Sequence, residues 1–139
     1  MDPLDRFIQA QAPVYAEVLE ELRAGRKRTH WMWFIFPQLR VLGRSATALH
    51  FGIGSLDEAR RYWDHPVLGE RLKTCTELVL GHADQRMERV LGDVDALKFR
   101  SCLTLFERAA PDAPVFGRAL EQCCHGERDP LTLRALAER

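Results

Sequence analysis

Six large apolar residues stand in an unbroken row at Trp31–Phe36. A basic stretch, Arg26–Arg28, comes just before the row, and Pro37-Gln38 closes it. Two of the three tryptophans of the chain lie in this row. So much apolar surface cannot all face water, because large apolar side chains are mostly buried in folded domains. The row therefore indicates either a core segment that anchors the fold or the floor of a binding site beside positive charge.

The length of the chain predicts one domain. With 139 residues, we expect a single domain, 1–139, able to bury roughly 68–70% of the surface of its unfolded chain. The composition is 46% hydrophobic and 29% charged, which is typical of a folded globular protein.

The charge balance limits the kinds of partner. There are 20 Lys and Arg residues against 20 Asp and Glu residues, so the net charge is +0. A neutral domain does not attract nucleic acid over long distances, and nucleic-acid binding through 23–28 is disfavoured. No segment approaches the ~20 apolar residues that span a bilayer. Asp2, Asp5 and Arg6 interrupt the first apolar residues, so we predict no signal peptide and a cytoplasmic location.

The four cysteines do not form a recognisable ligand pattern. Cys75, Cys102, Cys123 and Cys124 contain no CxxC pair, and we expect free thiols that pack in the interior of a cytosolic protein. The sequence Cys123-Cys124-His125 looks like a ligand cluster. Neighbours on a helix point in different directions, however. We therefore predict neither a metal site nor a cofactor.

Apolar residues at helical spacing predict an all-α fold of about seven or eight helices. Ser55 and Asp129 are typical N-caps, and Asp129 is followed by the proline that the first turn of a helix tolerates. No alternating pattern indicates a hairpin. Helices are expected at 13–25, 55–63, 66–81, 84–92, 93–110, 112–123 and 129–137.

Two segments leave their conformation open. The row 31–36 is short, apolar on every side and rich in residues that suit strands. Phe36 precedes a proline, which disfavours helical geometry, so the segment is expected to end there. The segment 46–53 lacks periodicity, and Gly52 and Gly54 interrupt its end.

No acidic residue occurs from Leu22 to Leu56, although six basic residues do. The guanidinium group of arginine binds phosphate or carboxylate groups through paired hydrogen bonds, and a planar base stacks on the face of an aromatic ring. Gly43 precedes a helix start that Ser45 could cap, and the free amides of a helix N-terminus bind anions. The alternative is a solvated basic loop beside core aromatics. We predict an anion or nucleotide pocket formed by Arg26, Lys27, Arg28, His30, Trp33, Gln38, Arg44 and Ser45.

Lys98 and Ser101 add a second group of candidate ligand-binding residues. They lie three residues apart beside the apolar stripe of the helix expected at 93–110. A lysine beside a serine can indicate an activated nucleophile. No general base and no nucleophile elbow accompany Ser101, so catalysis is not expected from it. The alternative is a helix boundary with an Asp95–Lys98 ion pair.

The chain resembles the domain-of-unknown-function family 1810. The elements that carry the resemblance are Arg6-Phe7, Gln11, Pro13-Val14-Tyr15, 22–27, 30–39, 42–45, Glu58-Ala59, 65–69, Arg71-Leu72, Lys98, Ser101 and 104–106. They span nearly the whole chain, and the decapeptide 30–39 is highly specific. The resemblance implies a mostly helical intracellular domain without an established reaction. One departure is a glycine within 50–54 where members more usually carry a larger residue.

Three functions are compatible with these patterns. We predict a small anionic or nucleotide-like ligand bound near 26–45 and 98–101. The alternatives are a protein-interaction module that uses exposed parts of the aromatic row, and an enzyme of ADP-ribose or N-glycoside metabolism. The last rests on a distant likeness to NADAR-type helical enzymes at Lys98-Phe99, Val115-Phe116 and Leu120. The calpastatin-like label sometimes given to the family does not fit, because such inhibitors are polar and disordered before binding.

Overall fold

The computed structural model describes residues 2–138 as an all-α domain, as predicted. The described residues form ten α-helices, slightly more than expected, and one short 3-10 helix, η1. The elements are α1 (Asp5–Gln11), α2 (Tyr15–Ala24), α3 (Met32–Ile35), η1 (Arg40–Leu42), α4 (Ala46–His50), α5 (Leu56–Asp64), α6 (Leu68–Leu80), α7 (Met87–Leu91), α8 (Asp93–Ala109), α9 (Pro114–Cys123) and α10 (Pro130–Ala137). No helix in the described part of the chain has both the length and the apolar character needed to cross a membrane.

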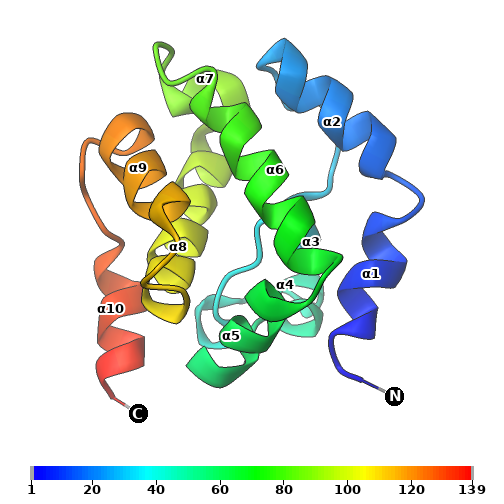
Figure 1. Ribbon diagram of the computed structural model, residues 1–139, viewed down its shortest axis with the longest axis vertical. Helices are drawn as coiled ribbons and strands as arrows, with labels where there is room; N and C mark the ends of the chain where they lie inside the picture. Colours follow the sequence, from blue (N-terminus) through cyan, green and yellow to red (C-terminus); the bar gives the residue numbers. More distant parts are fainter. Residues whose placement is uncertain (1, 139) are drawn as a thin grey trace.

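The longest helix, α8, organises the fold. It packs against α5, α7, α9 and α10, while α6 crosses the front of the molecule between α2 and α9 (Figure 1). The apolar stripe predicted for this helix is confirmed, since Phe99, Cys102 and Phe106 are completely buried. Phe106 in turn contacts the rings of Tyr62 and Phe116, at centroid distances of 5.3 and 5.7 Å. An aromatic cluster contributed by α5, α8 and α9 therefore lies within the hydrophobic core.

The additional helices are short. α1 has seven residues, of which only Phe7 and Gln11 are buried, so its sequence carries little apolar periodicity. Gln11 is held in place by polar contacts: its Nε2 donates to Phe34 O at 2.7 Å and to Tyr62 Oη at 3.1 Å. Its Oε1 accepts from Arg71 Nη1 at 3.3 Å. These contacts fix α1 against α3, α5 and α6, and a buried polar side chain needs such partners.

The predicted caps are confirmed at two helices. Ser55 Oγ accepts from Glu58 N at 3.0 Å, and Asp129 Oδ2 accepts from Thr132 N at 3.0 Å. The carboxylate of Glu58 accepts from Gly54 N at 2.8 Å. Gly25 ends α2 in the left-handed conformation, with φ +71°, which glycine adopts at little cost.

The two segments whose conformation the sequence leaves open each contain a short helix, α3 in 31–36 and α4 in 46–53. The row 31–36 contains a single helical turn, α3, which ends at Ile35 before the proline-linked Phe36. Beyond it, an isolated parallel bridge joins Leu39 to Ile53. Arg40 N donates to Ile53 O, and Ile53 N donates to Gln38 O, both at 2.8 Å. This bridge closes the loop that carries η1 and α4.

We expect Gly52→Ala to destabilise the domain strongly and Gly54→Ala to be tolerated. A Cβ at Gly52 would lie 2.3 Å from Arg40 Cα, which is backbone and cannot move aside. A Cβ at Gly54 would come no closer than 3.4 Å to the end of the flexible Arg40 side chain. Overpacking of this kind costs about 3 kcal/mol, against about 0.5 kcal/mol or less for a tolerated change. Urea unfolding of both variants measures the difference, and equal stabilities would contradict it.

Candidate functional site

The aromatic row divides between the core and the surface. Trp31 and Met32 are 1% and 2% exposed, and Ile35 and Phe36 are equally buried. Trp33 is only half-buried. The helical turn of α3 explains this division, because residues three and four apart share a face while the intervening ones point elsewhere. The row is therefore a core anchor at Trp31 and a potential binding surface at Trp33.

A single buried carboxylate holds the basic loop that precedes the row. Glu21, on α2, is 4% exposed. Its Oε1 accepts from Arg28 N at 2.6 Å, Thr29 N at 3.0 Å and Trp31 Nε1 at 3.1 Å. Its Oε2 accepts from Thr29 Oγ1 at 2.6 Å. The segment 22–56, which contains no acidic residue, thus begins directly after Glu21, whose carboxylate accepts hydrogen bonds from residues 28–31.

These contacts set the ionisation of Glu21. Burial by itself would raise the pKa of the carboxyl, but the hydrogen bonds from Thr29, Arg28 and Trp31 outweigh burial and lower the pKa to about 2. Hydrogen bonds to the charged form stabilise it in this way. Glu21 is therefore ionised at neutral pH and acts as a permanent anchor for 28–31.

Lys27 is held by neighbouring residues. Its Nζ lies 2.9 Å from Asp95 Oδ2 and 4.9 Å from the centroid of the Trp31 ring. The predicted alternative of an Asp95–Lys98 ion pair does not form, because Asp95 pairs with Lys27 instead. Lys27 therefore fastens the loop to α8 beside the core tryptophan.

Lys98 takes a different place from Lys27. Its Nζ lies 5.2 Å from the centroid of the Trp33 ring, a geometry in which a cation is attracted to the face of an aromatic ring. Within residues 2–138, no carboxylate forms a salt bridge with Lys98. The side chain covers the tryptophan face and keeps its charge available.

Gln38 and the loop 39–53 line a small cavity together with Trp33 and Lys98. The cavity is also lined by Met32, Leu39, Gly43, Ala48, Phe51 and Gly52. It measures only about 10 Å³, which is roughly the space that one water molecule occupies. We call this arrangement the Trp33–Lys98 site. With Lys98 in its present position, only the outer surface of the site is open to a ligand.

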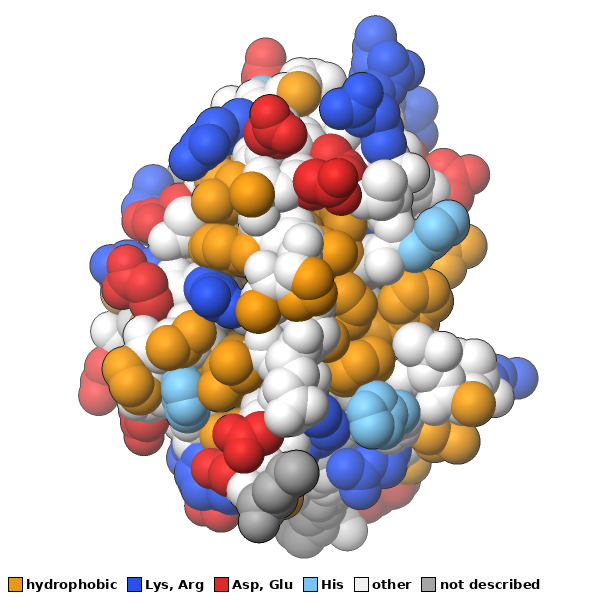
Figure 2. Space-filling model, turned by 90° about the vertical axis from the view of Figure 1, so that its right-hand side faces the viewer, with side chains coloured by type: hydrophobic (Ala, Val, Ile, Leu, Met, Phe, Trp, Pro, Cys, Tyr) orange, Lys and Arg blue, Asp and Glu red, His pale blue; other side chains and the backbone are white. Residues whose placement is uncertain are grey.

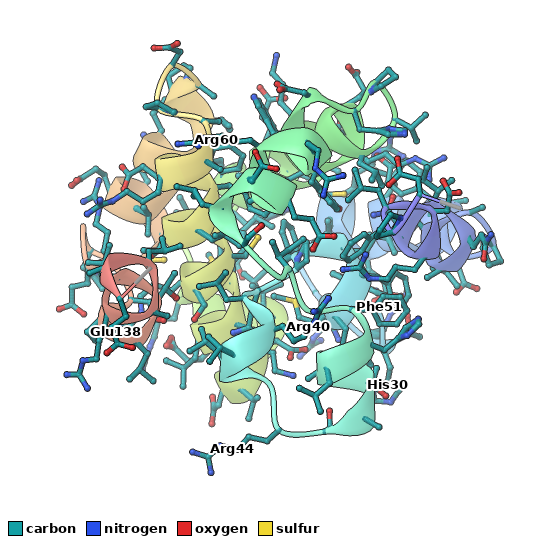
Figure 3. The ribbon with its side chains drawn as sticks, turned by 90° about the horizontal axis from the view of Figure 1, so that it is seen from below. His30, Arg40, Arg44, Phe51, Arg60 and Glu138 are labelled. Atoms are coloured by element: carbon teal, nitrogen blue, oxygen red, sulfur yellow. The ribbon has the colours of Figure 1, made fainter. Side chains whose placement is uncertain are left out.

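The remaining predicted residues lie outside this cavity. Arg26, His30 and Arg44 are exposed, and Arg44 extends away from the body of the molecule (Figure 3). Ser45 Oγ accepts from Ala48 N at 3.0 Å and so caps α4. Ser101 Oγ lies 3.0 Å from Asp129 Oδ2, which connects α8 to the start of α10. The structure thus brings together Trp33, Gln38 and Lys98 among the predicted residues.

Phe51 is the lining residue that sequence reasoning missed. Its ring lies 5.3 Å from that of Phe34 and 4.7 Å from that of His50. It belongs to the aperiodic segment 46–53, which the Leu39–Ile53 bridge and the Arg6 hydrogen bonds to His50 O and Gly52 O hold in place. No local sequence pattern predicts that Phe51 lies beside the row 31–36.

The cysteines are protonated at neutral pH. Burial raises the pKa of Cys75 to about 12, that of Cys123 to about 11 and that of Cys124 to about 12, and it also raises the pKa of Cys102. Within residues 2–138, no group of three or more His, Cys, Asp or Glu side chains is placed to hold a metal ion.

We expect all four thiols to be poorly reactive in the folded protein. The thiolate attacks alkylating agents, so a rise of about two pKa units slows Cys123 about 100-fold at pH 8. Cys75 and Cys102 should react only after unfolding, because they are completely buried. Mass spectrometry after iodoacetamide treatment, with and without denaturant, tests this. Modification of any cysteine at the rate of a free thiol would contradict it.

Comparison with known proteins places the chain in a family. The family model described as "Protein of unknown function (DUF1810)" matches residues 1–136. The chain is also similar to the conserved hypothetical protein Rv1873 from Mycobacterium tuberculosis, whose crystal structure superposes with a TM-score of 0.95. The identity is 50%, over 98% of this chain and 99% of that one. The comparison with curated proteins found no match. The chain therefore belongs to the DUF1810 family, as its sequence motifs suggested.

Proposed function

We propose that this domain binds a small anionic, nucleotide-like ligand at the Trp33–Lys98 site. The observation that carries the proposal is the ammonium group of Lys98 over the ring of Trp33, with no carboxylate in a salt bridge to it within the described chain. An anion can pair with this ammonium group, and a planar base can stack on the indole face once the flexible lysine moves aside. Gln38 offers an amide at the same cavity.

The surroundings of the site support an anion rather than a cation. The segment 22–56, which supplies most of the lining, contains no acidic residue. His30 and Arg44 are exposed on the same segment. The face shown in Figure 2 mixes acidic and basic side chains around apolar ones without a large area of one sign. Lys98 is the cation that lines the cavity, and a single cation suits a small ligand better than a nucleic acid, which needs an extended basic surface.

Calorimetric titration with AMP, ADP-ribose and inorganic phosphate tests this proposal. We expect Lys98→Met to weaken AMP binding about 10- to 100-fold, because it removes one charge-assisted contact. Lys73→Met is the matched control, since Lys73 is exposed on α6 and should bind AMP like the wild type. No heat with any of the three compounds, or equal affinities of the wild type and Lys98→Met, would refute the proposal.

A second candidate, a protein-interaction module, is favoured by two exposed apolar side chains on the loop that closes the site. Val41 is 65% exposed and Leu49 is 47% exposed. Val41→Asp separates the two functions. Binding of AMP that is lost in Lys98→Met and kept in Val41→Asp supports the ligand site. Absence of AMP binding in the wild type leaves the exposed apolar residues as the better-supported functional surface.

A further inference from the structure

Two apolar side chains project from the loop that runs from η1 through α4, residues 40–50. Val41 is 65% exposed and Leu49 is 47% exposed. η1 and α4 pack on each other, and Figure 3 shows them at one edge of the molecule, with Arg44 extending from that edge into solvent. Apolar side chains that gather on one protruding loop are typical of surfaces that meet a protein or a membrane. The charges of the loop decide between the two.

The loop carries cations without carboxylate partners. Arg40 and Arg44 are exposed, and neither forms a salt bridge in the described part of the chain. The segment 22–56, to which the loop belongs, contains no acidic residue. The two positive charges that flank Val41 are therefore available to an anionic surface.

The acids nearest to the other end of the loop lie beside cations of their own. Glu58 is 6% exposed, and its Oε1 lies 3.3 Å from Arg6 Nη2. Asp2 and Asp5 share a surface hollow with Arg6 and His50. The positive charge of the loop is therefore concentrated at its η1 end, around Val41.

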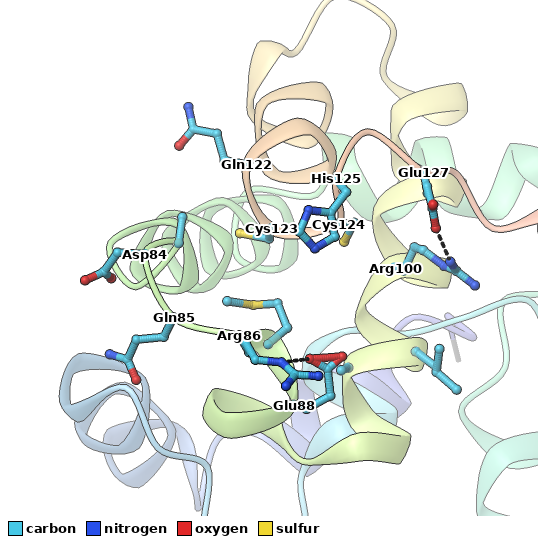
Figure 4. A pocket seen from close by; sticks show the side chains of 14 residues that line it. Asp84, Gln85, Arg86, Glu88, Arg100, Gln122, Cys123, Cys124, His125 and Glu127 are labelled. Atoms are coloured by element: carbon cyan, nitrogen blue, oxygen red, sulfur yellow. Dashed lines mark hydrogen bonds and ion pairs between the residues drawn. The ribbon is translucent and has the colours of Figure 1, made fainter.

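The cations at the larger hollow beside α8 are paired, in contrast to those of the loop. This hollow has a volume of about 350 Å³ and is shown in Figure 4. Arg86 Nε lies 3.8 Å from Glu88 Oε1, and Arg100 Nη1 lies 3.4 Å from Glu127 Oε2. Because each arginine there has an anion beside it, this side of α8 does not match the charge of an anionic surface.

The loop makes its own backbone hydrogen bonds. In η1, Gly43 N donates to Arg40 O at 2.9 Å. In α4, Ala48 N donates to Ser45 Oγ at 3.0 Å. Polar groups that already have partners enter a poorly hydrated region at a lower cost in free energy. The loop can therefore enter a layer of lipid headgroups without unfolding.

We propose that the loop 40–50 is a membrane-contact element that binds the surface of anionic lipid bilayers. Val41 and Leu49 insert among the headgroups, and Arg40 and Arg44 pair with the anionic groups of the lipids. A protein partner is the weaker choice, because Leu and Val are under-represented among the residues that dominate protein–protein binding. The contact is peripheral and reversible, since two side chains bury little apolar area.

This inference goes beyond ligand binding at the Trp33–Lys98 site and does not depend on it. Val41 and Leu49 do not line the cavity of that site. Titration of Val41→Asp with AMP therefore reports on the ligand site alone, and vesicle binding reports on the loop alone. Either proposal can fail while the other holds.

Co-sedimentation with lipid vesicles tests the membrane contact. The two preparations are pure phosphatidylcholine and phosphatidylcholine with about 30% phosphatidylserine. In about 0.1 M salt we expect binding to the anionic vesicles and about 25-fold weaker binding to the neutral ones, because each cation contributes about fivefold. In about 1 M salt the difference should disappear, since charges are then screened within about 3 Å. No binding to the anionic vesicles, or equal binding to both preparations, would overturn the proposal.

Matched variants assign the contact to the loop. Arg44→Gln should weaken binding to the anionic vesicles about fivefold, whereas Arg86→Gln should change it less than about twofold, because Arg86 already pairs with Glu88. Val41→Asp should weaken binding about tenfold or more. Val67→Asp is its control, since Val67 is 36% exposed and lies at the start of α6. Equal effects within either pair would show that the loop is not the contact.

Fluorescence quenching tests whether the loop enters the bilayer. Leu49→Trp adds an indole at the proposed contact, and Val67→Trp adds one elsewhere. With anionic vesicles that contain acyl-brominated phosphatidylcholine, we expect the added emission of Leu49→Trp, relative to the wild type, to be quenched and that of Val67→Trp to persist. An unquenched Leu49→Trp on vesicle-bound protein, or a second copy of the chain covering the loop in sedimentation velocity experiments, would contradict the proposal.

Discussion

Glu21→Ala is expected to lower the free energy of unfolding by about 3–5 kcal/mol, one of the two largest effects that we predict for a single substitution. The change removes the acceptor of four hydrogen bonds, from Arg28 N, Thr29 N, Thr29 Oγ1 and Trp31 Nε1. The Trp31 indole is 1% exposed, so its N–H would be left buried without a partner. Glu21→Gln should cost less, because the amide keeps one acceptor oxygen.

Urea unfolding at pH 7 measures this difference, with Glu20→Ala as the control. Glu20 is the preceding residue of α2 and is exposed, so its replacement should change stability by about 0.5 kcal/mol or less. Similar losses in the two alanine variants would show that Glu21 does not anchor the loop.

The same carboxylate gives the stability a dependence on pH. The pKa of Glu21 is lowered from 4.5 to about 2 in the folded protein. The stabilisation is therefore fully present above pH 4.5 and is lost as the pH falls through about 2. A depression of this size corresponds to about 3 kcal/mol. Between pH 4.5 and pH 2, the free energy of unfolding of the wild type should fall towards that of Glu21→Gln. A difference in unfolding free energy that stays constant between pH 6 and pH 2 would contradict the linkage.

Trp31→Ala should destabilise the domain by about 3–5 kcal/mol, whereas Trp33→Ala should cost about 1–2 kcal/mol. Trp31 is almost completely buried, packs against Phe36 at a centroid distance of 6.2 Å and donates to Glu21. Trp33 is half-buried and contacts Lys98 at the surface. The two residues are two positions apart in the sequence. The difference between their stability losses therefore tests whether the row 31–36 is divided between core and surface, and not the average cost of removing a tryptophan.

Thermal and urea unfolding of both tryptophan variants check this expectation. A full loss of cooperative unfolding in Trp31→Ala would agree with the prediction, because losses of this size approach the total stability of many domains. Equal destabilisation by both variants would mean that Trp33 also belongs to the core and would weaken the case for a ligand at that residue.

The all-α class could be predicted from the sequence because the longer helices bury a periodic stripe. The stripe of α8 is visible in its spacing alone, and Gly25 and Ser55 mark helix boundaries through local chemistry. Short helices carry too few turns to show a period. For that reason α1, which buries only Phe7 and Gln11, could not be found in this way.

The candidate site was only partly accessible to sequence reasoning. Trp33 and Lys98 could each be singled out, but their contact depends on packing between α3 and α8, which no local pattern encodes. The role of Glu21 was hidden for the same reason, since its partners lie seven to ten residues further along. A count of charges within the segment 22–56 leaves out Glu21, whose carboxylate accepts four hydrogen bonds from residues 28–31.

The most direct test of the Trp33–Lys98 site is the response of the three tryptophan indole N–H signals to AMP in a nitrogen–proton correlation spectrum. We predict a saturable shift of the Trp33 signal, a negligible shift of the buried Trp31 signal, and a Trp33 shift that requires about 10- to 100-fold more AMP in Lys98→Met but not in Lys73→Met. A Trp33 signal that stays in place at saturating AMP, or that titrates at the same AMP concentrations in Lys98→Met as in the wild type, would contradict the account.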